Sequence, residues 1–227
     1  MNTRLEIGRI AGIPIFLDMF FILVLMFFSH RYFTSGDSQQ MSAGIIIIAG
    51  IVASILLHEL GHALVGWLFK VRIAQIELTG LGGVVQFDSS LPPGVIPRMA
   101  IYLAGPAVNF LIYWGGAELA HMAAEAQKPV VVFVLVQLAM VNFFLCLFNL
   151  LPAFPLDGGH ALDALFSGLF GETWGRRIVG ALGIIIAIVI GLFAIQALPG
   201  SLFMLLLAFF LAELNWSAFQ NTDSRWR

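Results

Sequence analysis

Long apolar runs separated by short polar segments dominate the hydrophobic pattern of the chain. A helix needs about 20 mostly apolar residues to cross a hydrocarbon core of roughly 30 Å. Several runs reach or approach this length with few charged residues inside them. The pattern predicts about six transmembrane helices, over residues 10–28, 43–69, 99–120, 130–151, 178–198 and 200–217.

Residues 71–88 follow a different pattern, in which apolar and polar residues alternate around Gly80, Gly82 and Gly83. Alternation of this kind, with a glycine-rich turn, is typical of two short strands. The sequence therefore predicts an all-α polytopic membrane protein with a small membrane-associated β-hairpin or sheet after the second helix. We expect residues 1–227 to form a single membrane-embedded domain.

The composition supports this class and excludes others. Hydrophobic residues make up 60% of the chain and charged residues 11%, whereas soluble domains have roughly 45–50% and about 25%. A net charge of −2 without a basic block argues against nucleic-acid binding. The single cysteine, Cys146, excludes a disulfide framework and a cysteine-based metal cage. The lipid bilayer is thus an expected partner, and the sequence indicates no oligomeric state.

The basic residues predict an orientation. With six crossings, nine of the 11 Lys and Arg residues fall on the side of the termini, and only Arg31 and Lys128 fall on the other side. Because positive residues concentrate in cytoplasmic loops, both termini are expected in the cytoplasm. His62 precedes Lys70 by eight residues, which is about 12 Å along a helix. The polar residues around His62 are therefore expected in the cytoplasmic half of the bilayer.

The strongest chemical signal is the segment His58-Glu59-Leu60-Gly61-His62 inside the second predicted helix. Residues four apart lie on one face of a helix, so His58 and His62 can both direct a nitrogen to one metal ion. Glu59 is placed beside them to hold a water molecule, which is the H-E-x-x-H arrangement of zinc hydrolases. An acid at the centre of a spanning helix costs roughly 2.5–3.5 kcal/mol on insertion. Ionisable residues in such positions indicate function, although polar residues that merely bond neighbouring helices are the alternative.

Two histidines do not complete a catalytic zinc site, which normally has three protein ligands and an open position. The third ligand is expected to be another acid in or near the membrane. Asp157 is notable because Pro152 and Pro155 break the fourth helix just before it. From spacing alone, however, Asp157 could equally be a metal ligand or an ordinary loop acid at the membrane surface. The candidate acids are Asp18, Glu118, Asp157, Asp163 and Glu213.

Three segments together give the chain a resemblance to the site-2 protease family of intramembrane zinc metalloproteases. They are HELGH at 58–62, GPAVN at 105–109 and NLLPAFPLDGGH at 149–160. The resemblance covers nearly the whole chain and implies one zinc ion bound by His58, His62 and Asp157. It also implies that Glu59 is the catalytic base and that Asn149 and Asn109 assist the substrate oxyanion. For both asparagines, an interhelical hydrogen bond is the alternative.

The resemblance further implies an activity and a location. We expect hydrolysis of peptide bonds within or near transmembrane segments of membrane proteins, in a bacterial or archaeal cytoplasmic membrane. The family's PDZ insertion and C-terminal nucleotide-sensing domain have no counterpart in the pattern, so a minimal form is expected. The alternative function is a catalytically silent metal-binding membrane protein or a metal transporter. A transporter would show internal repeats and several polar helices, and the sequence has neither.

Overall fold

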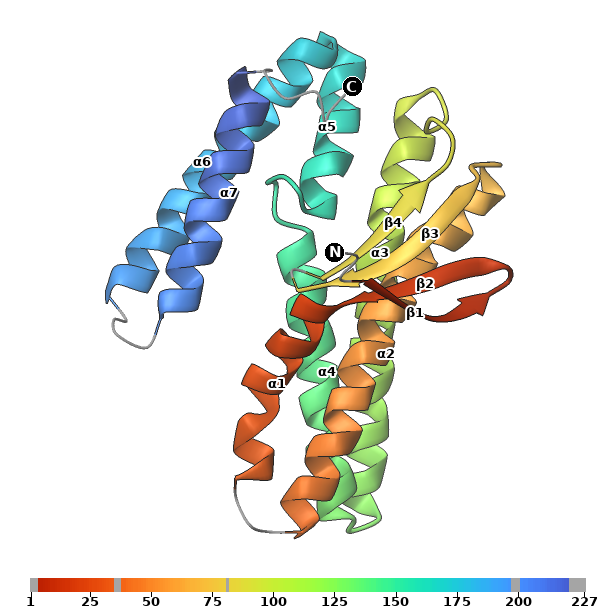
Figure 1. The fold of residues 1–227 in the computed structure, drawn as a ribbon, viewed down its shortest axis with the longest axis vertical. Coiled ribbons are helices and arrows are strands. Elements are labelled where there is room, and N and C mark those ends of the chain that lie inside the picture. The colour runs from red at the N-terminus through yellow and green to blue at the C-terminus, as the bar shows by residue number, and fades with distance from the viewer. Residues whose placement is uncertain (1–3, 35–37, 81, 197–200, 221–227) are drawn as a thin grey trace. The chain divides into compact units, whose positions relative to one another are not determined.

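The computed structural model describes residues 4–34, 38–80, 82–196 and 201–220. Contacts divide the chain into two compact units. The first unit comprises Met1–Leu91 and Ala104–Cys146, and the second comprises Pro92–Leu103 and Leu147–Arg227. The described residues form four strands and seven helices (Figure 1). In chain order they are β1 (Arg4–Ile10), β2 (Ile13–Asp18), α1 (Met19–Phe33), α2 (Ser38–Leu68), β3 (Ile73–Thr79), β4 (Gly82–Phe87), α3 (Val95–Glu125), α4 (Pro129–Asn149), α5 (Asp157–Phe170), α6 (Glu172–Gln196) and α7 (Leu202–Gln220).

The strands of the first unit form one sheet in the order β1-β2-β3-β4. β1 and β2 are antiparallel, β2 and β3 are parallel, and β3 and β4 are antiparallel. The sheet packs against α2, where Ile15 and Ile76 are buried against Ala63 (Figure 1). Strands β3 and β4 lie within the range 71–88 for which the sequence predicts strands. The helix turn that carries the HELGH segment therefore lies beside the sheet.

The predicted helix at 10–28 is wrong in its first half. Residues 4–18 form the β1–β2 hairpin, and helix α1 begins only at Met19. Ala11 and Gly12 both have positive φ angles, of 50° and 84°, as a two-residue hairpin turn requires. An apolar run of this kind cannot be assigned to strand or helix by periodicity alone. The combination of Gly12 and Pro14 inside the run was the available signal for a turn.

Among the described residues, five helices are long and apolar enough to cross a membrane. They correspond to the predicted helices at 43–69, 99–120, 130–151, 178–198 and 200–217, and they are Met41–Leu68 within α2, then α3, α4, α6 and α7. The fold is thus mostly helical with a small four-stranded sheet. Helix α1 has 15 residues, or about 22 Å of length, which is short for a crossing.

The second unit is helical. Helix α6 packs along α7, and α5 packs against α6 (Figure 1). Its core contains Phe154, Val179 and Ala218. The apolar pattern predicts no helix at α5, because that segment is mixed in polarity. The predicted break after the fourth helix is present, since α4 ends at Asn149 and α5 starts at Asp157.

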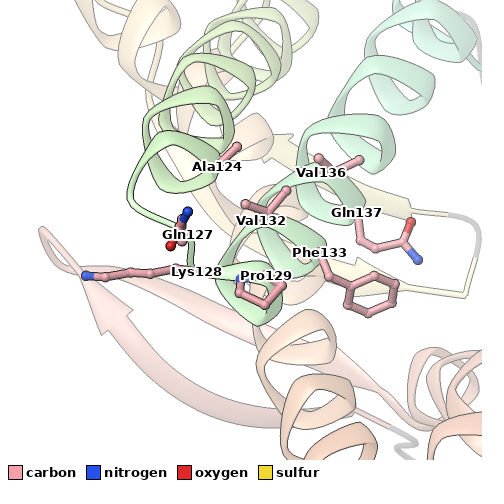
Figure 2. A pocket seen from close by; sticks show the side chains of 8 residues that line it. All are labelled: Ala124, Gln127, Lys128, Pro129, Val132, Phe133, Val136 and Gln137. Atoms are coloured by element: carbon pink, nitrogen blue, oxygen red, sulfur yellow. The ribbon is translucent and has the colours of Figure 1, made fainter.

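An open groove of about 830 Å³ lies where α3 turns into α4 in the first unit (Figure 2). Its walls are mainly apolar and contain one basic residue, Lys128. The residues that line it include none of the candidate site residues. They are Ala124, Gln127, Lys128, Pro129, Val132, Phe133, Val136 and Gln137.

Candidate metal centre

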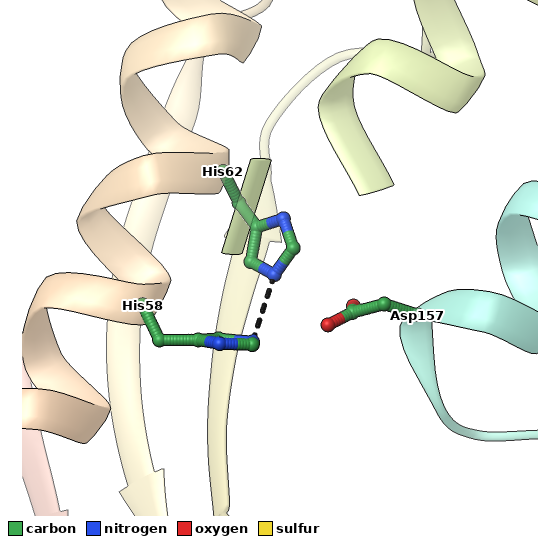
Figure 3. A group of neighbouring side chains, drawn as sticks. All are labelled: His58, His62 and Asp157. Atoms are coloured by element: carbon green, nitrogen blue, oxygen red, sulfur yellow. Dashed lines mark hydrogen bonds between the residues drawn. The ribbon is translucent and has the colours of Figure 1, made fainter. Parts of the chain in front are cut away.

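The two histidines of the HELGH segment face the same way from α2 (Figure 3). Their Nε2 atoms are 3.1 Å apart, and their rings meet edge to face with centroids 4.8 Å apart. Both side chains are buried, with 6% exposure each. Two nitrogens that bind one tetrahedral zinc at 2.0–2.1 Å are about 3.3 Å apart. The observed separation of the nitrogens therefore fits a shared zinc ion.

Gly105 of α3 provides the space in front of these nitrogens. A Cβ atom at this position would lie 2.5 Å from Nε2 of His58 and would also collide with Nε2 of His62. The glycine lies in the GPAVN segment, four residues before Asn109. A side chain at position 105 would thus occupy the place where an ion would contact both histidines.

We expect Gly105→Ala to weaken zinc binding about 10-fold or more, because overpacking in a tight site typically costs 1–3 kcal/mol. Gly115→Ala is the matched control, since a Cβ there has no heavy atom within 4 Å and lies in the same helix. Both changes raise helix propensity, so helix stability does not account for a difference between them. Zinc titration of the two purified variants measures it. Equal affinities would contradict the described placement of the imidazoles.

A buried network of hydrogen-bonded polar side chains leads away from His58. Its Nδ1 lies 2.5 Å from Oδ1 of Asn109. Nδ2 of Asn109 donates to Oδ1 of Asn142 at 2.8 Å, and Nδ2 of Asn142 donates to Oγ of Ser54 at 2.9 Å. Both asparagines have no exposed surface, and Ser54 is 4% exposed. Asn109, which the resemblance assigns to the oxyanion, thus contacts a candidate metal ligand directly.

Glu59 lies next to the histidine pair and is 3% exposed. One carboxylate oxygen is 4.0 Å from Nε2 of His58. Gly83 of β4 lies directly against this side chain, because a Cβ at position 83 would collide with the Glu59 carboxylate. Strand β4 therefore passes beside the acid that the sequence predicts to be the base.

Asp157 is the first residue of α5 in the second unit and is half-buried. The positive end of the helix dipole favours an ionised carboxylate at this position, and zinc binds carboxylates in that form. Gly159 allows the preceding loop to cross the helix start, since a Cβ there would lie 2.5 Å from the backbone of Ala153. Asn215 of α7 holds the same loop, with its side chain bonded to the backbone N–H and C=O of Phe154 at 2.9 and 2.8 Å.

The other acids considered as ligands have different environments. Asp18 caps α1 by accepting a hydrogen bond from the backbone N–H of Phe20 at 2.9 Å. Asp163 accepts a hydrogen bond from Ser167, and burial raises the pKa of its carboxyl, opposed by the charge of Arg176. Glu118 and Glu213 are exposed.

Asn149 is the last residue of α4 and is half-buried. Sequence reasoning did not single out Asn142, Ser54 or Asn215, all of which are buried and hydrogen-bonded. The available signal was the presence of amide and hydroxyl residues inside strongly apolar helices, where polar side chains need partners.

The chain is similar to known zinc peptidases along most of its length. The model of "Peptidase family M50" matches residues 46–117 and 115–192. A zinc metalloprotease of Methanocaldococcus jannaschii is 32% identical over 87% of this chain and 56% of its own length. Stage IV sporulation protein FB of Bacillus subtilis is 32% identical over 50% of this chain and 38% of its own. The chain thus spans little more than half the length of the first of these relatives.

Among solved structures, the fold is similar to that of the site-2 protease from Methanocaldococcus jannaschii. The TM-score is 0.69 at 27% sequence identity, with 95% of each chain covered.

Proposed function

The chain belongs to peptidase family M50, the site-2 protease family, and on that premise we propose that it is an intramembrane zinc metalloprotease. The observation that carries the proposal is the buried pair of imidazoles 3.1 Å apart, with an acid beside it, inside a helix apolar enough to span a membrane. A transporter does not account for the match to a peptidase family over residues 46–192. A catalytically silent metal binder would not need the acid Glu59, which is present beside the two histidines.

We propose that His58, His62 and Asp157 hold one zinc ion. Each offers one ligand atom of a kind that zinc binds. Asp157, the first residue of α5, lies within the segment 149–160 that carries the resemblance. When bound, zinc would supply Lewis-acid activation of water and of the scissile carbonyl. The two imidazoles and the carboxylate would hold it with a combined charge of −1, which leaves the occupied site positive towards a developing oxyanion.

Glu59 is proposed as the general base. Its carboxylate would accept a proton from the attacking water and return it to the leaving amine. This side chain is buried and lies directly against Gly83. Asn149 is proposed to donate a hydrogen bond to the substrate oxyanion, while the amide of Asn109 is already bonded to His58 and Asn142.

The proposed substrates are transmembrane segments of other membrane proteins. Peptide bonds of a helix are hidden, so a substrate must unwind and be held in an extended form before hydrolysis. Strand β4 is an edge of the sheet among the described residues, and it lies against Glu59. An extended peptide can pair with such an edge through its backbone, so β4 is proposed as the strand that holds the substrate.

Proline at the open edge of β4 is expected to slow cleavage about 10-fold or more without removing zinc, because proline lacks the donor that an added strand needs. Successive N–H groups of a strand point to opposite edges. Val84→Pro and Val85→Pro therefore test the two edges separately, since one removes an outward donor and the other a donor to β3. Peptide turnover and zinc content are measured for both. Wild-type turnover in both variants would remove β4 from the mechanism.

We further propose that both termini lie in the cytoplasm and that the zinc site lies in the cytoplasmic half of the membrane. The distribution of Lys and Arg supports this orientation. Within the part of the chain that the structure describes, five helices qualify as crossings, and the proposal of six requires α1 to serve as a short one. Hydrolysis is tested by reconstituting the full chain with a panel of transmembrane peptides, with a chelator as control. Cleavage that persists after the chelator has removed all zinc would overturn the proposed function.

A further inference from the structure

The direction of the hydrogen bonds in the buried network behind His58 is determined by two backbone carbonyls. The side chain of Asn142 lies 2.9 Å from the carbonyl oxygen of Leu138, one turn earlier in α4. A carbonyl oxygen can only accept, so the atom that faces it is the NH₂ group of Asn142. Reversing this amide would place two acceptors against each other. The amide orientation, which often has to be assigned from its surroundings, is therefore determined here by the backbone.

The directions of the other hydrogen bonds in the network follow from this orientation of Asn142. With its NH₂ group towards Leu138 and Ser54, Asn142 presents Oδ1 to Asn109. Asn109 must then direct its own NH₂ group to Asn142 and its Oδ1 to Nδ1 of His58. The hydroxyl of Ser54 donates to the carbonyl oxygen of Gly50 at 2.7 Å, which leaves its oxygen to accept from Asn142. Every hydrogen bond in the network then has one donor and one acceptor.

From this we infer that Asn142 is a positioning residue: through Asn109 it holds His58 as the Nδ1–H tautomer, with the lone pair of Nε2 directed at His62 and the metal position. Nδ1 of His58 faces an acceptor and must carry the proton. A neutral imidazole protonated at Nδ1 has its only lone pair at Nε2. This is the nitrogen 3.1 Å from Nε2 of His62. The inference extends the proposed function to a residue on α4 that does not contact the metal.

The polar side chains of this network need one another as partners because they are shielded from water. The exposed fractions of its four side chains lie between 0% and 6%, for His58, Asn109, Asn142 and Ser54. A hydrogen bond left unmade in such buried surroundings costs about 1–3 kcal/mol. Partners of this kind orient a ligating histidine, and their loss typically reduces metal affinity by 10- to 100-fold. The amide of Asn142 therefore helps to orient His58, a proposed zinc ligand that it does not contact.

The experiment observes the His58 tautomer directly, in the metal-free full chain labelled with ¹⁵N-histidine in detergent. Long-range ¹H–¹⁵N correlation distinguishes Nδ1–H from Nε2–H, and the His58 signals are assigned by their loss in His58→Gln. The wild type is expected as Nδ1–H. In Asn142→Leu the amide of Asn109 can reverse, so the Nε2–H form is expected to appear, and zinc affinity is expected to fall about 10-fold.

Two further variants make the result specific. Asn215→Leu is the matched control, because Asn215 is equally buried and also donates to a carbonyl one turn earlier, that of Leu211. It is expected to leave the His58 tautomer unchanged. Asn109→Asp added to Asn142→Leu is expected to restore Nδ1–H, because a carboxylate accepts in either orientation.

The inference is overturned if wild-type His58 is the Nε2–H tautomer, or if folded Asn142→Leu keeps Nδ1–H and wild-type zinc affinity. It is also overturned if the double variant does not restore Nδ1–H. These readouts need no substrate, so absence of peptide cleavage would reject the proposed function while leaving the tautomer result intact.

Discussion

Replacing Glu59 with glutamine is expected to reduce peptide hydrolysis by about 10²- to 10⁴-fold, the usual contribution of a general base, and to leave zinc binding within twofold of wild type. Glutamine has nearly the same shape but cannot accept the proton of the attacking water. Glu59 is buried beside Gly83 and is not among the three proposed ligands. The loss is therefore expected in the rate constant for hydrolysis and not in the metal content.

Zinc stoichiometry and single-turnover cleavage of a transmembrane peptide together check this expectation. Glu118→Gln is the control, since it makes the same chemical change at an exposed position of α3. A Glu59→Gln protein without zinc would show that the carboxylate contributes to metal binding. A variant with more than a tenth of wild-type turnover would show that another group accepts the proton.

Replacing Asp157 with alanine is expected to remove both zinc and activity. Only two imidazoles would remain as ligands, whereas catalytic zinc usually has three protein ligands. The loss of affinity should exceed the roughly 10- to 100-fold that follows from removing an outer partner of a ligand. The helix dipole at the start of α5 favours the ionised carboxylate that zinc requires.

Competition of each purified variant with a chelator of known affinity measures the loss. Asp163→Asn is the control, because Asp163 is also a half-buried acid of α5 and its carboxyl has a pKa raised by burial. It is expected to retain zinc. If Asp163→Asn or Glu213→Gln loses zinc while Asp157→Ala keeps it, the third ligand has been assigned to the wrong acid.

The apolar pattern predicted the long helices well because length and hydropathy are local properties of a chain. It failed at residues 10–18, where Ile13–Asp18 form a strand of the sheet. A short apolar run satisfies a buried strand as well as half of a membrane helix. The choice between them depends on partners in the sheet, and the partner strand β3 lies about 60 residues further along the chain.

The sequence by itself determined the family through three segments, at 58–62, 105–109 and 149–160. It also indicated the histidine pair of the proposed zinc site, because the spacing of His58 and His62 requires only the local geometry of α2, whereas Asp157 as third ligand rests on the resemblance. The tertiary structure decided which nitrogen of His58 carries the proton, since that depends on Asn109 and Asn142 from two other helices. It likewise decided that Gly105 faces the histidines and that Asn215 holds the loop before Asp157. Hydrogen bonds and close contacts between distant segments are properties of the folded chain, so no local pattern encodes them.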